Sequence, residues 1–141
     1  MKKLVIVIFA LVAITACNNS GNKKTDGDVS STAVLNEDLS VVNVYYFYGK
    51  QRCKTCIAVG NVAQETIKKD FAGNKNIRFT EVNTSEKTNE KLVEKYQVTW
   101  NALIIVKGDD AVDITEEAFA TANENPETLA NRIKDEVNSR L

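Results

Sequence analysis

The chain contains no histidine and only one proline among its 141 residues. Without histidine, the sequence offers no imidazole for general-base catalysis, for a Ser-His or Cys-His nucleophile, or for metal ligation. Any chemistry must therefore come from thiols, carboxylates or amines. The charges nearly balance, at 18 basic and 19 acidic residues. The sequence therefore lacks the excess of basic residues that would indicate a nucleic-acid partner.

No uninterrupted apolar run reaches the length of about 20 residues that a membrane-spanning helix needs. Residues 4–13 are apolar, follow Lys2 and Lys3, and lead into small residues. This pattern predicts a secretory signal peptide over residues 1–16. Its end, Ile14-Thr15-Ala16-Cys17, resembles the bacterial lipobox. The resemblance implies that Cys17 receives a diacylglyceryl group, carries acyl chains such as palmitate, and becomes the first residue of the mature protein. An ordinary signal peptide with Cys17 as a stray thiol is the alternative.

The lipobox prediction also sets the compartment and the domain boundaries. Several acyl chains anchor a protein durably, whereas one binds a membrane only marginally. We therefore expect a lipoprotein of the bacterial cell envelope, held to the membrane through Cys17 and facing the periplasm or the cell exterior. Residues 17–36 are rich in Asn, Ser, Gly and Lys and predict a flexible tether, although residues 29–35 could form a short edge strand. Residues 37–141 suffice for one folded domain.

Cysteine is scarce, with three residues in all. Assigning Cys17 to the lipid leaves one pair, Cys53 and Cys56. The Cys-x-x-Cys motif follows an apolar run and precedes a segment with helical periodicity, so the pair lies where a strand turns into a helix. The two thiols can close a disulfide or share a soft metal ion. Outside the cytoplasm a disulfide can persist.

Apolar runs predict the strands. Residues 41–48 and 102–106 are apolar almost throughout, as expected for strands covered on both faces. Residues 76–83 alternate between apolar and polar and predict a third strand, with an unclear register. Residues 111–115 predict a hairpin partner after the turn at residues 108–110.

Helical periodicity and caps predict the helices. The first begins at Cys53 and stops at Gly73-Asn74, with apolar residues on one face. The second is expected from a cap at Thr84 or Ser85 to about residue 97. The last begins at Asn125-Pro126. The pattern of residues 116–124 fits either a loop or a short helix. The predicted order is β-α-β-α-β-β-α.

This order, with the cysteine pair at the first strand–helix junction, resembles the thioredoxin fold over about residues 39–141. Tyr46-Phe47 ahead of Cys53-Lys54-Thr55-Cys56 is similar to the family's first motif, and Lys107-Gly108 is similar to its hairpin entry. The resemblance implies an α/β protein, a three-layer α/β/α sandwich around a central mixed sheet of about four strands. It also implies that Cys53 is the nucleophile and that Cys56 resolves the mixed disulfide.

The surroundings of Cys53 favour a thiolate. A helix N-terminus carries a partial positive charge, and Arg52 and Lys54 flank the cysteine. Both effects are expected to hold the pKa of Cys53 below the free-thiol value of about 8.5. Cys56 lies one turn deeper and is expected to be less ionised.

Two positions depart from the thioredoxin pattern. The family has a cis-proline before the strand that faces the disulfide, whereas this sequence has Asn101 after Trp100. We expect a trans peptide here, because a non-proline cis bond costs about 2.5–4 kcal/mol. The family's buried aspartate would fall at Phe47, and its absence is expected to slow proton transfer at Cys56. Trp100 either supplies part of the surface beside the thiols or is an ordinary core aromatic.

The leading hypothesis is a membrane-anchored, extracytoplasmic thiol–disulfide oxidoreductase or dithiol electron carrier, with protein thiols or disulfides as partners. The alternative is a redox-inactive thioredoxin-fold binding module with a structural disulfide, motivated by Asn101 and Phe47. A third hypothesis is Cu(I) handling by the two thiolates, since Zn²⁺ usually takes four ligands. We expect no cofactor, no resident metal and no nucleic-acid partner.

Overall fold

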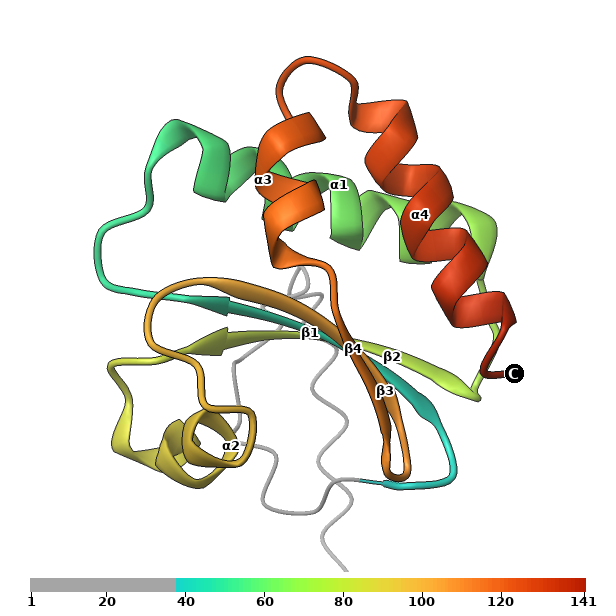
Figure 1. Cartoon of the computed structure of the whole chain (residues 1–141). Helices are drawn as coiled ribbons and strands as arrows, with labels where there is room; N and C mark the ends of the chain where they lie inside the picture. Colours follow the sequence, from blue (N-terminus) through green and yellow to red (C-terminus); the bar gives the residue numbers. More distant parts are fainter. Residues whose placement is uncertain (1–37) are drawn as a thin grey trace, which may run out of the picture.

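The computed structural model describes residues 38–141 (Figure 1). The predicted signal peptide, Cys17 and the predicted tether over residues 17–36 lie outside the described residues. In chain order the elements are β1 (Val42–Tyr48), α1 (Lys54–Asp70), β2 (Ile77–Asn83), a 3₁₀ turn (Lys87–Asn89), α2 (Glu90–Lys95), β3 (Ala102–Lys107), β4 (Asp110–Asp113), α3 (Thr115–Thr121) and α4 (Pro126–Asn138).

The strands form one mixed sheet in the order β2-β1-β3-β4. β1 runs parallel to β2 and antiparallel to β3, and β3 pairs antiparallel with β4. In this register Tyr46 of β1 lies beside Glu81 of β2 and Leu103 of β3. The predicted mixed sheet of about four strands is confirmed. The register between β1 and β2, which the sequence left unclear, places Glu81 next to the strand that leads into the Cys-x-x-Cys motif.

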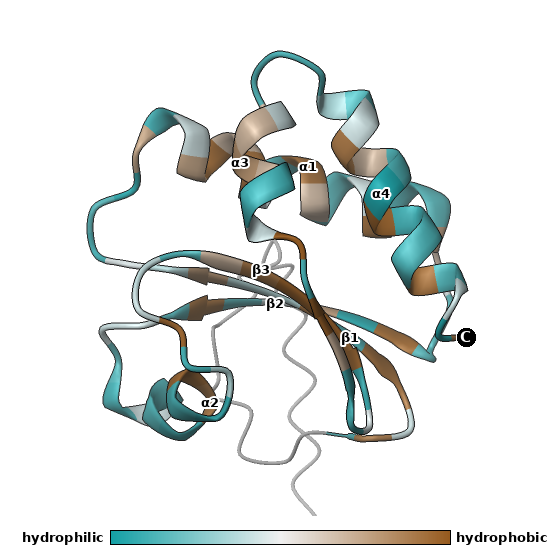
Figure 2. Ribbon diagram, in the orientation of Figure 1, coloured by the Kyte–Doolittle hydropathy of each residue, from teal (hydrophilic) through white to brown (hydrophobic). Residues whose placement is uncertain are grey.

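Helices cover both faces of the sheet. α1, α3 and α4 lie on one face and α2 lies on the other, which gives the predicted three layers (Figure 1). Alternate side chains of β1 enter the two layers: Val44 and Tyr46 pack under α1, whereas Tyr45 and Phe47 pack toward α2. The two central strands, β1 and β3, are buried along nearly their whole length because both faces are covered, and Figure 2 shows hydrophobic stretches within the sheet.

The helices bury the faces that their periodicity predicts. In α1, Val59, Ala63 and Ile67 are buried against the sheet. In α4, the buried residues follow the same spacing and are Leu129, Ile133 and Val137. Complete burial of such a side chain contributes about 1.5–3 kcal/mol, so these faces fix the helices to the sheet.

One helical prediction needs correction, and one open segment is resolved. The helix expected from residue 84 begins later, as a 3₁₀ turn and then the short α2, and neither has a side-chain cap. The Thr84 hydroxyl instead donates to the Tyr48 carbonyl, and Ser85 donates its N–H to Asn83. The segment left open between a loop and a short helix forms α3, which begins one residue earlier, at Thr115. The observed order therefore has one more helix before the last one.

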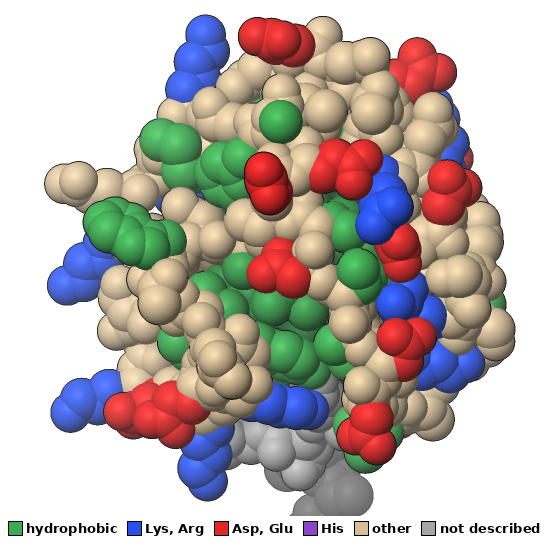
Figure 3. Space-filling view, in the orientation of Figure 1, with side chains coloured by type: hydrophobic (Ala, Val, Ile, Leu, Met, Phe, Trp, Pro, Cys, Tyr) green, Lys and Arg blue, Asp and Glu red, His purple; other side chains and the backbone are tan. Residues whose placement is uncertain are grey.

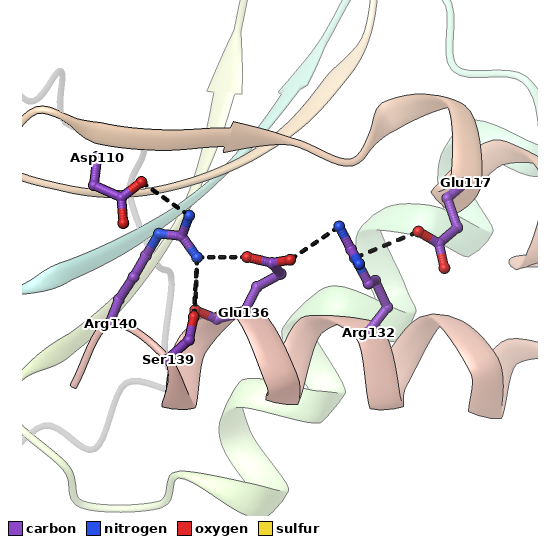
Figure 4. A network of polar contacts seen from close by, with 6 residues as sticks. All are labelled: Asp110, Glu117, Arg132, Glu136, Ser139 and Arg140. Atoms are coloured by element: carbon purple, nitrogen blue, oxygen red, sulfur yellow. Dashed lines mark hydrogen bonds and ion pairs between the residues drawn. The ribbon is translucent and has the colours of Figure 1, made fainter.

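A chain of ion pairs joins the C-terminal helix to its neighbours (Figure 4). Arg132 of α4 contacts Glu117 of α3 at 3.4 Å and Glu136 at 2.9 Å, and Arg140 contacts Asp110 of β4 at 3.1 Å. Acidic and basic side chains accordingly alternate on part of the surface (Figure 3). Ion pairs with at least one solvent-exposed partner contribute about 1 kcal/mol each, so they support the packing rather than create it.

Candidate functional site

The Cys-x-x-Cys motif forms the N-terminus of α1. β1 ends at Tyr48, the chain crosses above the sheet edge, and Cys53 is the extended residue that caps the helix beginning at Lys54. Cys53 and Cys56 are joined by a disulfide, with their Cα atoms 4.9 Å apart. The Cys53 sulfur also accepts a hydrogen bond from the Cys56 N–H at 3.0 Å. The capping sulfur therefore lies where the unpaired N–H groups of the helix favour negative charge.

The two cysteines differ in exposure. Cys53 is exposed, whereas Cys56 is only 3% exposed and packs toward the sheet. A partner sulfur can therefore approach Cys53 directly, whereas Cys56 is buried within α1. This asymmetry fits the roles that the resemblance implies, with attack at Cys53 and resolution by Cys56.

Arg52 is held against the sheet, which differs from the expected free cation beside Cys53. Its guanidinium forms an ion pair with Glu81 of β2 at 2.8 Å. It also lies over the ring of Tyr48, 4.4 Å from the centroid, and near the ring of Tyr46 at 5.5 Å. Burial alone would lower the pKa of Arg52, but the hydrogen bond and charge of Glu81 raise it above its ordinary value. Lys54 is exposed at the first position of the helix.

Tyr46 supports the helix from below. Its hydroxyl donates a hydrogen bond to the Cys56 carbonyl at 2.5 Å, and its side chain is fully buried. Burial raises the pKa of Tyr46, and the nearby Arg52 charge opposes that shift. Phe47, which the family pattern aligned with a buried aspartate, packs on the α2 face of the sheet instead. The side chain beneath the motif is therefore Tyr46, a position that strand alternation in β1 could have indicated.

The loop before β3 lies beside the disulfide. The Asn101 amide nitrogen is 3.7 Å from the Cys56 sulfur, and the Asn101 side-chain oxygen accepts a hydrogen bond from the Gly49 N–H at 3.4 Å. Asn101 thus connects the end of β1, the motif and this loop. No peptide bond within residues 38–141 is cis, which agrees with the expected trans peptide. Trp100 is 79% exposed, so the core-aromatic interpretation of this residue is wrong.

A second polar contact fixes the motif from the other side. Asn123, which follows α3, donates a hydrogen bond to the Thr55 hydroxyl at 2.8 Å. Thr55 lies between the two cysteines, so α3 and the Asn101 loop both touch the motif. The sequence reasoning had assigned no role to Asn123, Tyr46 or Glu81.

Residues 38–141 contain no group of three or more Cys, Asp or Glu side chains placed to hold a metal ion. No helix in the same range is both long enough and apolar enough to cross a membrane.

Comparisons with known proteins support the fold. No protein-family model and no curated protein matches the sequence. A solved structure of a malarial protein is 21% identical, with a TM-score of 0.50, over 72% of this chain and 98% of that one. The J-Trx1 fragment of ERdj5 is 19% identical, with a TM-score of 0.50 over 70% of this chain. This chain spans only 44% of that fragment. At these identities the comparison concerns the fold alone, and the described domain has the thioredoxin-like α/β fold.

Proposed function

We propose that the protein is a lipid-anchored thiol–disulfide oxidoreductase or dithiol electron carrier that works outside the cytoplasm. The observation that carries the proposal is the disulfide between an exposed Cys53, at the cap of α1, and a buried Cys56 one turn later. Thiol exchange requires an accessible sulfur of low pKa with a resolving partner within reach. Protein thiols or disulfides are the proposed partners.

In the reductive direction, the Cys53 thiolate attacks one sulfur of a partner disulfide, and the other partner sulfur leaves as a thiolate. Cys56 then attacks the Cys53 sulfur, which forms the intramolecular disulfide and releases the second partner thiolate. Two electrons pass to the partner, and the departing thiolates take up the protons lost by Cys53 and Cys56. Oxidation of a partner dithiol is the reverse sequence.

Trapping of covalent partners tests the proposal. In a Cys56→Ser variant, Cys53 should remain joined to its partner as a mixed disulfide, because no second thiol resolves it. The matched Cys53→Ser variant should trap far less, since Cys56 is buried. The trapped species are counted by non-reducing electrophoresis and identified by mass spectrometry. The exchange proposal fails if neither variant yields mixed disulfides and the wild-type couple does not cleave protein disulfides.

The same experiment separates the alternative, a binding module with a structural disulfide. Asn101 favours this alternative because it stands where working thioredoxins have a proline. A binding module would retain its partner in a variant carrying both Cys53→Ser and Cys56→Ser. An oxidoreductase would lose the covalent partner in that variant.

The envelope location rests on the Ile14-Thr15-Ala16-Cys17 motif, outside the described residues. Expression in a bacterium fed labelled palmitate should label the wild-type chain and leave a Cys17→Ser variant unlabelled. Equal labelling of the two chains would exclude lipidation at Cys17.

A further inference from the structure

A charge pair lies beneath the start of α1. Arg52, the residue before the capping cysteine, reaches Glu81 of β2 at 2.8 Å, and the two side chains are 29% and 35% exposed. Because Glu81 lies beside Tyr46 in the sheet, the pair spans from the motif to the neighbouring strand. The Arg52 Nε is buried without a hydrogen-bond partner in the part of the chain that the structure describes. The guanidinium is thus held by Glu81 and by the faces of tyrosine rings.

Gly60 of α1 makes room for this arrangement. A methyl group at Gly60 would come within 2.8 Å of the Arg52 Nη2 and within 2.8 Å of the Tyr46 ring. A Cβ atom essentially never lies that close to another heavy atom, so a larger residue would force the guanidinium or the ring to move. The helix above, the sheet below and Glu81 therefore fix Arg52 from three sides.

We propose that Glu81 is a positioning residue that holds the Arg52 guanidinium against the sheet and thereby sets the equilibrium between the disulfide and dithiol forms of Cys53 and Cys56. The inference rests on the proposed function, since it concerns the same redox couple. Glu81 acts through Arg52 and has no contact with a partner protein in this proposal.

Electrostatics gives the direction of the effect. The charged and titratable groups around the guanidinium are Glu81 on β2 and Tyr46 and Tyr48 on β1, with Glu86 acting on Tyr48. Glu81 offsets the positive charge of the Arg52 guanidinium, so the Cys53 thiolate of the reduced protein gains less from Arg52 than an unpaired guanidinium would provide. Less thiolate stabilisation favours the disulfide. The couple is therefore more reducing with Glu81 in place.

The experiment measures the redox equilibrium of the full chain in glutathione or dithiothreitol buffers. Oxidised glutathione takes two electrons and two protons from the dithiol, which yields the protein disulfide and two molecules of reduced glutathione. Glu81→Gln should lower the equilibrium constant for this oxidation by about threefold, equal to about 14 mV for a two-electron couple. The pKa of Cys53, measured by thiolate absorbance in the reduced protein, should fall in the same variant.

Two further variants keep the result specific. Gly60→Ala presses on both the Arg52 guanidinium and the Tyr46 ring and should shift the equilibrium in the same direction as Glu81→Gln, because it separates the guanidinium from Glu81. Asp110→Asn breaks the Arg140 ion pair at the far end of the sheet and should leave the equilibrium constant unchanged. An unchanged constant in Glu81→Gln, or an equal shift in Asp110→Asn, overturns the proposal. A wild-type couple that equilibrates with glutathione but cleaves no protein disulfide would contradict the proposed function instead, and the Glu81 comparison would stand.

Discussion

Tyr46 joins the sheet to the redox motif through one hydroxyl group. A fully buried tyrosine needs a hydrogen-bond partner, and this one donates to the Cys56 carbonyl at 2.5 Å. The same ring lies beside Arg52, and a side chain at position 60 would require the ring or the guanidinium to shift. The first turn of α1 is therefore held at Cys56 by Tyr46 and ahead of Cys53 by Arg52.

Tyr46→Phe removes that hydrogen bond and retains the ring. We expect the free energy of unfolding at pH 7 to fall by about 0.5–1.5 kcal/mol, the usual contribution of one such bond. Urea unfolding followed by circular dichroism measures the change. Tyr48→Phe is the matched control, because Tyr48 is partly exposed and the structure shows no hydrogen bond from its hydroxyl to the described residues. The free energy of unfolding of Tyr48→Phe should fall by no more than about 0.5 kcal/mol. Equal losses in the two variants would contradict the role given to the Tyr46 hydroxyl.

The same residue gives an alkaline pH dependence. Burial raises the pKa of Tyr46 above its ordinary value of 10.0, so the folded protein holds the phenol proton more tightly than the unfolded chain does. Its contribution is complete below pH 10 and is lost as the pH rises above 10 through the folded pKa. The free energy of unfolding of Tyr46→Phe should therefore fall less than that of the wild type as the pH rises above 10. The test is urea unfolding of both proteins at a series of pH values. Parallel curves of the free energy of unfolding against pH would show that Tyr46 does not titrate in this way.

At the scale of elements, burial decided what could be predicted. β1 and β3 are apolar along their length because helices cover both faces, and this continuous pattern predicted them. Asn125-Pro126 predicted the start of α4, and Asn125 does cap that helix by accepting from the Thr128 N–H. In contrast, Thr84 had the chemistry of a cap but donates to the Tyr48 carbonyl on another strand. That tertiary contact has no trace in the local sequence.

The candidate site divides in the same way. Its covalent part lies within four consecutive residues, so the place of Cys53 and Cys56 at the start of a helix could be predicted from the local sequence, while the spacing alone left a disulfide and a shared metal ion both open. Glu81 lies 29 residues after Arg52, and their ion pair depends on the β1–β2 register that the alternating pattern left unclear. Asn123 likewise reaches Thr55 only because α3 packs against α1. Contacts between distant segments are set by packing, which short-range patterns do not encode.

For the molecule as a whole, two apolar layers hold the fold. One lies between the sheet and α1, α3 and α4, and the other lies between the sheet and α2. The disulfide closes a very short loop, with a sequence separation of 3. Chain entropy assigns so short a loop only about 2 kcal/mol. Domains of this size are stable by about 5–15 kcal/mol, so most of the stability must come from the core.

A variant carrying Cys53→Ser and Cys56→Ser should therefore remain folded at 25 °C. We expect its free energy of unfolding to fall by about 2 kcal/mol or less, and we expect the reduced wild type to match it. Urea unfolding of the oxidised wild type, the reduced wild type and the variant measures these values. A carrier that alternates between dithiol and disulfide has to keep its partner surface in both states, and this result would show that it can. Cooperative unfolding of the wild type on addition of reductant alone would instead identify the disulfide as structural and favour the binding-module alternative.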